Sequence, residues 1–304
     1  MSRAASIEAE FTAIARRALP AWGIEAPELA VLKIRENAVF AVTLPDGARY
    51  ALRIHRSGYH SPTELDGEIA WADALNAAGI ATPRAIRTTS GAVAVTLPYP
   101  GGGADCHIDL FEWIAGHQLG TSEQGIEDPN ALPATFRSLG ELAAAVHNHS
   151  STWIPPAGFA RHAWDCEGLV GEQPLWGRFW ELAALSAGEC QLMQRVRSVL
   201  KEQLQKLPKT PDVYGLIHAD LVPENVLIDG DTLRLIDFDD CGFGWYLFEI
   251  ATALYFVEPS QQAMAAQNMV DGYRRLRPLS HQQLEQLDLF LLARGTTYLG
   301  WVHT

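Results

Sequence analysis

The stretch of sequence that decides the fold is Tyr214–Ala251, YGLIHADLVPENVLIDGDTLRLIDFDDCGFGWYLFEIA. Its first four residues predict a short apolar strand, which leads directly into the triplet His218-Ala219-Asp220. Residues 226–228 and 233–236 predict two more strands, and the Asp-Gly-Asp sequence at 229–231 predicts the tight turn between them. The segment therefore predicts a β-hairpin shortly after the first strand.

This hairpin is expected to bring three polar side chains together. Asn225 precedes its first strand, Asp237 follows its second, and Asp220 stands five residues before Asn225. Magnesium prefers hard oxygen ligands, so one carboxylate and one amide oxygen can hold it while phosphate oxygens fill other positions. A separate carboxylate that binds no metal can accept a hydroxyl proton and direct that oxygen at phosphorus. Kinase-type phosphoryl transfer requires this division of labour.

The motif H-A-D-L-V-P-E-N over 218–225, followed by L-I-D-F over 235–238, resembles the catalytic loop and metal-binding segment of the kinase-like phosphotransferases. This superfamily includes aminoglycoside phosphotransferases, choline kinases and type II homoserine kinases. The resemblance is strong over 214–251 and continues in the same order over 31–116. It implies an enzyme that uses ATP and Mg²⁺ to phosphorylate an alcohol group.

Within the motif, the resemblance implies a role for each matching residue. Asp220 matches the catalytic base, and Asn225 and Asp237 match the Mg²⁺ ligands. His218 matches a histidine that supports the catalytic loop. Glu249 stands where many relatives have an aspartate that braces the same loop.

The resemblance also implies a phosphate-binding cation in the N-terminal part. Arg53, in Y-A-L-R-I, takes the place of the ATP-phosphate lysine, and its guanidinium can donate to two phosphate oxygens at once. Glu68 is the expected partner that orients Arg53, and Glu64 competes for that role.

Two further stretches match the nucleotide site of the family. Residues 36–42, which include Asn37 but no glycine, occupy the place of the phosphate-covering loop. Residues 109–116 resemble the hinge that binds adenine, with Phe111 and Trp113 at its centre.

The wider pattern predicts an α+β chain. Residues 28–54 are rich in strand formers with a turn at 45–47, Ser61 and Glu64 form a capping-box sequence, and helical periodicity dominates from about residue 117. The resemblance implies a protein-kinase-like bilobal fold, with a small β-rich nucleotide-binding lobe over 1–110. A larger helical lobe with the catalytic loop and substrate site is expected over 111–304. One of its helices is expected to bury a face made of Leu192, Val196, Val199, Leu200 and Leu204.

Composition excludes several classes of protein. The 304 residues include 23 basic and 36 acidic ones, and a net charge of −13 opposes binding to nucleic acid or to an anionic membrane. No apolar run is long enough to span a bilayer. Four scattered cysteines without a C-x-x-C pair favour a cytoplasmic protein with reduced thiols.

The two ends of the sequence give weaker indications. The first twenty residues predict an amphipathic helix and not a signal peptide. The last five, GWVHT, contain no helix stop signal, and natural sequence beyond them is therefore an expectation.

Charge near the motif favours a particular acceptor. Residues 218–249 contain eight acidic side chains and a single Lys or Arg, Arg234. An acceptor with an amine or quaternary nitrogen, such as an amino alcohol, homoserine or an aminoglycoside, suits this charge. Glu224, Asp239 and Asp240 are the candidates to contact it, and Asp239 also stands where protein kinases have the glycine of D-F-G.

Two alternatives stay open on the same scaffold. One is a Ser/Thr protein kinase, against which only eleven residues separate Asp237 from Glu249, where an activation segment would lie. The other is a nucleotide-binding pseudokinase, which the departures at Arg53 and Glu249 favour.

Overall fold

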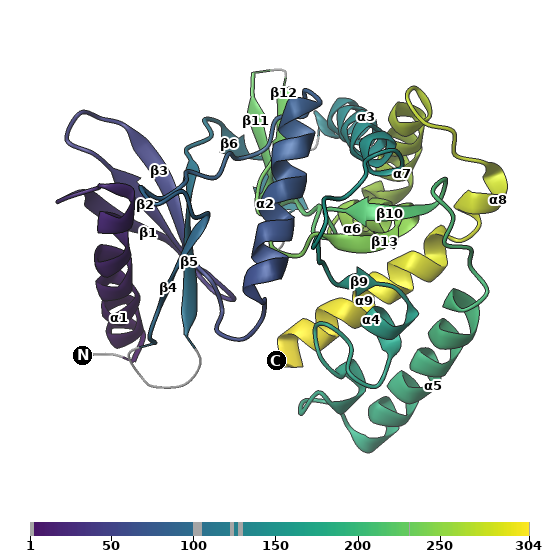
Figure 1. Ribbon diagram of the computed structural model, residues 1–304. Coiled ribbons are helices and arrows are strands. Elements are labelled where there is room, and N and C mark those ends of the chain that lie inside the picture. Colours follow the sequence, from purple (N-terminus) through teal and green to yellow (C-terminus); the bar gives the residue numbers. More distant parts are fainter. Residues whose placement is uncertain (1–2, 100–104, 122–124, 127–129, 231, 304) are drawn as a thin grey trace. The chain divides into compact units, whose positions relative to one another are not determined.

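The computed structural model describes residues 3–99, 105–121, 125–126, 130–230 and 232–303. The chain divides into two compact units (Figure 1). The first unit comprises residues 1–76, 82–115 and 156–160, and the second comprises residues 77–81, 116–155 and 161–304. No helix among the described residues has both the length and the apolar character that crossing a bilayer requires.

The first unit is built on a five-stranded antiparallel sheet with strand order β1-β2-β3-β5-β4. Its elements are α1 (Arg3–Ala18), the 3-10 turn η1 (Leu19–Trp22), β1 (Glu28–Ile34), β2 (Ala38–Thr43), β3 (Arg49–Ile54), α2 (Pro62–Ala77), β4 (Ala94–Leu97) and β5 (Cys106–Glu112). The turn predicted at 45–47 closes the β2–β3 hairpin, where the N–H of Leu44 donates to the carbonyl of Ala48 (2.8 Å). Gly47 adopts φ = 88° there, a conformation that glycine reaches without a steric cost.

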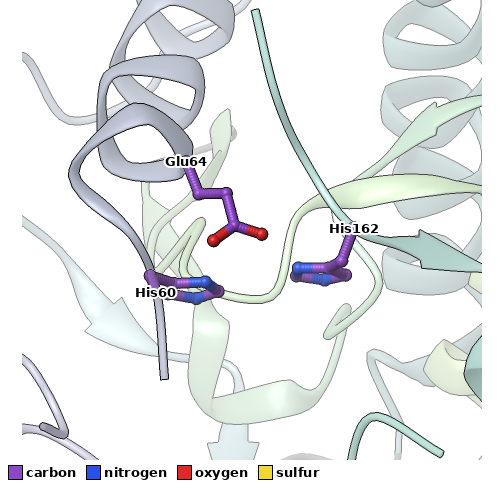
Figure 2. Close-up of side chains that lie close together, drawn as sticks. All are labelled: His60, Glu64 and His162. Carbon is purple, nitrogen blue, oxygen red and sulfur yellow. The ribbon is translucent and has the colours of Figure 1, made fainter. Parts of the chain in front are cut away.

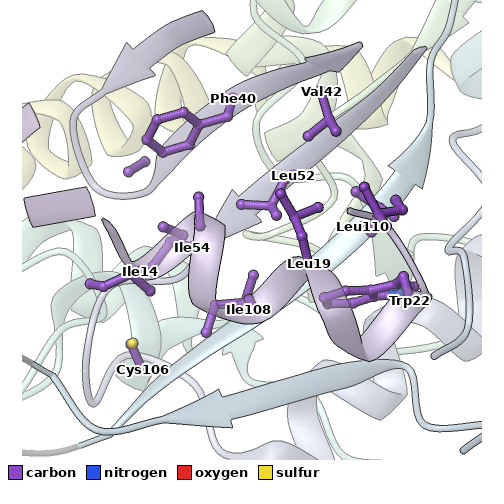
Figure 3. Packing of buried hydrophobic residues seen from close by; sticks show 14 residues of the cluster. Ile14, Leu19, Trp22, Phe40, Val42, Leu52, Ile54, Cys106, Ile108 and Leu110 are labelled. Atoms are coloured by element: carbon purple, nitrogen blue, oxygen red, sulfur yellow. The ribbon is translucent and has the colours of Figure 1, made fainter. Parts of the chain in front are cut away.

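The core of the first unit lies between α1 and one face of the sheet. Successive side chains of a strand point to opposite faces, so the even-numbered residues of β2, β3 and β5 share this side. Figure 3 shows the residues that pack here, among them Ile14, Leu19, Trp22, Phe40, Val42, Leu52, Ile54, Ile108 and Leu110. The odd-numbered residues of the same strands therefore belong to the opposite face, where the charged cluster described below lies.

Helix α2 begins at the predicted capping box. Ser61 Oγ accepts the N–H of Glu64 (3.3 Å), and Glu64 Oε2 accepts the N–H of Ser61 (2.9 Å). Figure 2 shows Glu64 on the first turn of α2 and His60 just before it. The reciprocal cap fixes the start of the helix and with it the direction of Glu68, one turn further on.

The described part of the second unit is mostly helical and contains three small sheets, with strand orders β10-β13-β9, β12-β11-β6 and β7-β8. Its helices are α3 (Leu132–Ser150), α4 (Cys166–Val170), η2 (Phe179–Glu181), α5 (Ala187–Leu204), η3 (Pro223–Asn225), α6 (Tyr246–Tyr255), α7 (Pro259–Arg274), α8 (His281–Leu284) and α9 (Leu287–His303). Its strands are β6 (His117–Gln118), β7 (Gly120–Thr121), β8 (Gly125–Ile126), β9 (Ala163–Trp164), β10 (Tyr214–Ile217), β11 (Val226–Asp229), β12 (Thr232–Leu235) and β13 (Gly242–Trp245). The predicted α+β fold class is confirmed.

The predicted buried face of α5 is wrong in part. Leu200 and Leu204 are buried, but Leu192 and Val199 are about half exposed, at 45% and 51%. At about 100° per residue, Leu192 and Val199 lie toward one edge of the predicted face and Leu200 and Leu204 toward the other. The packed face of α5 is therefore narrower than predicted and covers the second edge.

Helices α3 and α7 approach each other at two glycines, and they run side by side in Figure 1. A Cβ atom on Gly140 would collide with the carbonyl oxygen of Met269, and one on Gly272 would collide with the carbonyl oxygen of Arg137. Each glycine thus lets the backbone of its helix contact the backbone of the other.

We predict that Gly140→Ala lowers the free energy of unfolding by about 1–3 kcal/mol, because the added methyl group forces α3 and α7 apart. The loss exceeds the gain of up to about 1 kcal/mol from the better helix propensity of alanine. Gly188→Ala in α5 is the matched control, since no atom lies within 4 Å of its Cβ position. Urea unfolding followed by circular dichroism measures both, and a Gly140→Ala variant as stable as the parent would contradict the close approach.

Candidate active site

The predicted hairpin is present and is formed by β11 and β12, which pair in antiparallel register. At its open end the N–H of Ile236 donates to the carbonyl of Asn225 (3.0 Å). Asp237 follows Ile236 directly, so the two expected metal ligands lie at the same end of the hairpin. Asp231 of the predicted turn falls outside the described residues.

Asp220 lies between two hydrogen-bond donors. Its Oδ1 accepts from Nη2 of Arg294 on α9 (2.9 Å), and its Oδ2 accepts from Nδ2 of Asn225 (2.8 Å). Burial raises the pKa of Asp220 above its ordinary value, and the nearby charge of Asp237 adds to the rise, whereas Arg294 opposes it. The structure thus brings Asp220, Asn225 and Asp237 together, with the side chain of Asp220 still 22% exposed.

His218 joins the loop to the hairpin. Its Nε2 lies 2.9 Å from the carbonyl oxygen of Ile236 and must donate the proton, so Nδ1 is the acceptor for the N–H of Asp220 (3.3 Å). A ring with one donating and one accepting nitrogen is a neutral imidazole. Because His218 is fully buried and both of its ring nitrogens bind backbone groups, its geometry fits the supporting role expected for it.

Glu249 on α6 holds the backbone of the same loop. Its Oε1 accepts the N–H of His218 (3.0 Å), and its Oε2 accepts the N–H of Ala219 (2.7 Å). Ala219 adopts φ = 65° and Asp237 φ = 63°, in the left-handed region. For a residue with a Cβ atom this conformation costs about 1–2 kcal/mol. The two hydrogen bonds from Glu249 help to hold the loop in it, and they show that a glutamate at this position reaches both amides.

Glu249 is positioned in turn by His147 on α3. His147 Nε2 lies 3.8 Å from Glu249 Oε1, its Nδ1 hydrogen-bonds the hydroxyl of Tyr273 (2.8 Å), and its ring stacks on Tyr246. Burial favours the protonated form of Glu249, but the nearby imidazole of His147 and the hydrogen bond from the backbone N–H of His218 outweigh burial. They hold the pKa of Glu249 below its ordinary value.

In the first unit, Arg53 is paired with two carboxylates. Its Nη2 donates to Oε1 of Glu68 (2.8 Å), and its Nε and Nη2 donate to Oδ1 and Oδ2 of Asp109 (3.2 and 2.7 Å). Arg53 on β3 is the direct cross-strand neighbour of Asp109 on β5. Glu68 is thus the acid of α2 that contacts Arg53, while Glu64 serves the helix cap.

Asp109 was not identified from the sequence. Burial would raise its pKa, but Arg53 and the ring of His55, whose Nε2 lies 2.8 Å from Oδ2 of Asp109, outweigh burial and hold that pKa below its ordinary value. The signal that could have found it is an acid in the middle of the apolar strand CHIDLFE.

The other expected nucleotide residues also lie in the first unit. Asn37 stands in the β1–β2 turn, where its Oδ1 accepts a backbone N–H just beyond the end of β3 (2.9 Å). The ring of Phe111 lies 4.9 Å from the guanidinium carbon of Arg53, and that of Trp113 lies 3.7 Å from the guanidinium carbon of Arg49. Both rings therefore lie on the same face of the sheet as Arg53.

Of the residues expected to contact the phosphate acceptor, Asp240 is connected to Asp220 through Trp176 and Arg294. Its Oδ1 accepts from Nε1 of Trp176 (3.1 Å), and the Trp176 ring lies 4.8 Å from the guanidinium carbon of Arg294. Asp239 is buried, and Glu224 belongs to η3.

Arg294 is the second residue that sequence reasoning missed. It is 2% exposed and lies 74 positions from Asp220 in the chain. A single cation inside the apolar run LDLFLLARGTTYLGW is the signal that could have marked it.

The first unit is an antiparallel sheet with a buried cation, and the second is mostly helical with a carboxylate-bearing loop and hairpin. These features are typical of the kinase-like phosphotransferase folds. The model of the phosphotransferase enzyme family matches residues 30–282, and the chain belongs to this family.

Named relatives act on several small molecules. Amicoumacin kinase of Bacillus subtilis is 26% identical over 237 residues, which cover 78% of this chain and 65% of that protein. A homoserine kinase of Methylobacillus flagellatus is 26% identical over 261 residues, which cover 81% of this chain and 70% of that protein. The solved structure of a microcompartment-associated aminopropanol kinase is 32% identical and superposes with a TM-score of 0.84, covering 96% of this chain and 89% of that one.

Glu249→Gln is predicted to lower the free energy of unfolding by about 2–4 kcal/mol at pH 7, because the amide can accept only one of the two backbone N–H groups. The pKa of Glu249 is depressed in the folded state, so its carboxylate stabilises the fold above the ordinary glutamate pKa. This stabilisation is lost as the pH falls through that value and below it.

The difference between parent and Glu249→Gln should therefore be smaller at about pH 3 than at pH 7 in urea unfolding, because the loss begins only near the ordinary glutamate pKa of 4.5. Glu202→Gln, at an exposed i,i+4 pair with Lys206, is the control and should change stability little at either pH. A difference that stays constant with pH would show that the carboxylate charge is not what holds the loop.

Proposed function

We propose that this chain transfers the γ-phosphate of Mg-ATP to a hydroxyl group of a small, amine-bearing molecule. The observation that carries the proposal is the grouping of Asp220, Asn225 and Asp237 at one end of the hairpin, on a loop held by Glu249. Membership of the phosphotransferase enzyme family supports the same reaction class.

The donor set suits Mg²⁺. Asn225 uses its amide N–H on Asp220, which leaves its Oδ1 as the atom for a cation. The Asp237 carboxylate at the same end supplies a second hard oxygen, as Mg²⁺ prefers. Asn225 and Asp237 would hold the metal, which when bound offsets negative charge on the phosphate oxygens.

Asp220 is the proposed base. Its carboxylate accepts the proton of the acceptor hydroxyl as that oxygen bonds to the γ-phosphorus and the bond from phosphorus to the departing ADP oxygen breaks. Arg294 and Asn225 each hold one oxygen of Asp220, so the carboxylate is oriented before the acceptor binds. Such orientation raises the rate of phosphoryl transfer, because the protein accelerates this reaction mainly by positioning groups and stabilising charge.

In the first unit, Arg53 is the proposed ligand of the ATP phosphates, with Glu68 as the acid of α2 that orients it. Asn37 is placed by the same proposal in the phosphate-covering turn, and the backbone from Phe111 to Trp113 binds adenine. The contact of the Phe111 ring on β5 with the Arg53 guanidinium on β3 supports neighbouring positions for the adenine and phosphate contacts.

An amine on the acceptor is supported by charge. Residues 218–249 contain eight acidic side chains and a single Lys or Arg, and the Asp240 carboxylate among them accepts the indole N–H of Trp176. Asp240 and Trp176 together offer an acidic and aromatic surface for a cation. The names of the relatives, among them aminopropanol kinase, support an amino alcohol.

A small acceptor is favoured over a protein. The residues between Asp237 and Glu249 include β13, which pairs with β10, and leave no long segment that could bind a peptide.

The four free cysteines support a cytoplasmic enzyme, because thiols stay reduced in that compartment.

We predict that Asp220→Asn keeps Mg-ATP binding but loses turnover by about 10³-fold, because the amide cannot take up the hydroxyl proton. Asp237→Ala should instead weaken nucleotide binding in the presence of Mg²⁺. Asp229→Asn, at the other end of the same hairpin, is the control and should keep both properties. ADP release and calorimetric titration separate the two effects, and normal turnover in Asp220→Asn would remove Asp220 from the mechanism.

The acceptor class is tested with matched alcohols. We expect 1-amino-2-propanol and homoserine to be phosphorylated at least about tenfold more efficiently than 1,2-propanediol, since an ammonium group can form an ion pair with the Asp240 carboxylate and a second hydroxyl cannot. ADP release and phosphorus NMR of the products measure the ratio. Equal use of the diol would exclude the amine as a recognition element.

A further inference from the structure

The Arg53 cluster supports an inference that rests on the proposed function and extends it. We propose that Arg53 and Asp109 are a matched pair, in which Asp109 fixes the orientation of the guanidinium toward the nucleotide phosphates. Asp109 is then a positioning residue, and it makes this site specific for arginine over lysine at position 53.

The contacts fix the guanidinium in its plane. Nε of Arg53 meets Oδ1 of Asp109 at 3.2 Å and Nη2 meets Oδ2 at 2.7 Å, so two adjacent donors face both oxygens of one carboxylate. Two parallel hydrogen bonds of this kind prevent rotation of the guanidinium. Glu68 takes a further hydrogen of Nη2 at 2.8 Å, and Phe111 lies against one face.

The backbone brings this pair together before any ligand is bound. Arg53 and Asp109 are direct partners across β3 and β5, and both are buried, at 5% and 2% exposure. Phe111 and His55 stand two positions away along the chain and therefore face the same side of the sheet. A buried charge must be paired, so neither member can be removed without leaving the other in an unfavourable setting.

The carboxylates distinguish arginine from lysine. Glu68 and Asp109 both bind Arg53, which offers them three hydrogen bonds from two nitrogens. A lysine ammonium has three donors on a single nitrogen, so contacts to Glu68 and to both oxygens of Asp109 would use all three and leave none for a phosphate. An asparagine at position 109 would remove one of the two carboxylates that compete for the ammonium and leave a simple ion pair between the introduced lysine and Glu68.

The test compares Arg53→Lys, Asp109→Asn and the double variant by Mg-ATP binding, kcat and the urea midpoint. Arg53→Lys should weaken nucleotide binding by about tenfold or more, and the double variant should return to within about threefold of the parent. Asp109→Asn alone should lower kcat by about tenfold without weakening Mg-ATP binding, because phosphates are bound but misplaced.

Arg87 and Asp73 provide a matched control in the same unit. Their side chains form an exposed pair at 3.9 Å, with 56% and 50% exposure, and Arg87→Lys with Asp73→Asn repeats the same chemical changes. These variants should leave nucleotide binding and kcat unchanged and show no coupling.

The proposal is overturned if Arg53→Lys binds Mg-ATP as the parent does, or if the double variant is no better than Arg53→Lys. If Arg53→Lys does not fold, Asp109→Asn decides alone, and an unchanged kcat in that variant rejects the proposal. A parent protein that neither binds nucleotide nor transfers phosphate would refute the proposed function. The pairing itself would still be judged by whether the urea midpoint shifts of the two single variants fail to add in the double one.

Discussion

The Glu249 carboxylate accepts hydrogen bonds from two backbone N–H groups, and the rest of the candidate site depends on this interaction. A chain that turns through a left-handed residue at Ala219 exposes amide groups that no regular strand or helix can satisfy. Glu249 satisfies those of His218 and Ala219 at once, and it remains charged because His147 and these amides favour the carboxylate. These two hydrogen bonds also orient the backbone at Asp220, because Asp220 is the next residue after Ala219.

The two units solve opposite electrostatic problems. In the second unit a buried anion is stabilised by backbone donors and a histidine, so that its charge serves to hold a loop. In the first unit a buried cation is surrounded by Glu68 and Asp109 and stacked on Phe111. In both cases the charge costs less because a regular element holds it against its partners, α6 for Glu249 and the β3–β5 ladder for Arg53.

What could be predicted from the sequence depended on how local the determinant is. The β11–β12 hairpin and the capping box of α2 depend on residues within a few positions of one another, and both are confirmed. The cap also shows which of the two glutamates can bind Arg53. Glu64 is held at the start of α2 by its hydrogen bond to Ser61, so Glu68 contacts Arg53. Asp109 and Arg294 were missed because their partners lie 56 and 74 positions away, and only strand register or helix packing brings them together.

The left-handed backbone at Ala219 and Asp237 shows why a short motif fixes so much geometry. Both residues carry a Cβ atom and have a steric cost that the surroundings must offset. His218 binds the carbonyl of Ile236, next to Asp237, and accepts the N–H of Asp220, next to Ala219. One imidazole thus bridges the two strained positions, so neither can relax without breaking a buried hydrogen bond of the other. The proposed base and one expected metal ligand are thereby held in register by the same ring, and that coupling explains why histidine, with one donor and one acceptor nitrogen, suits this position.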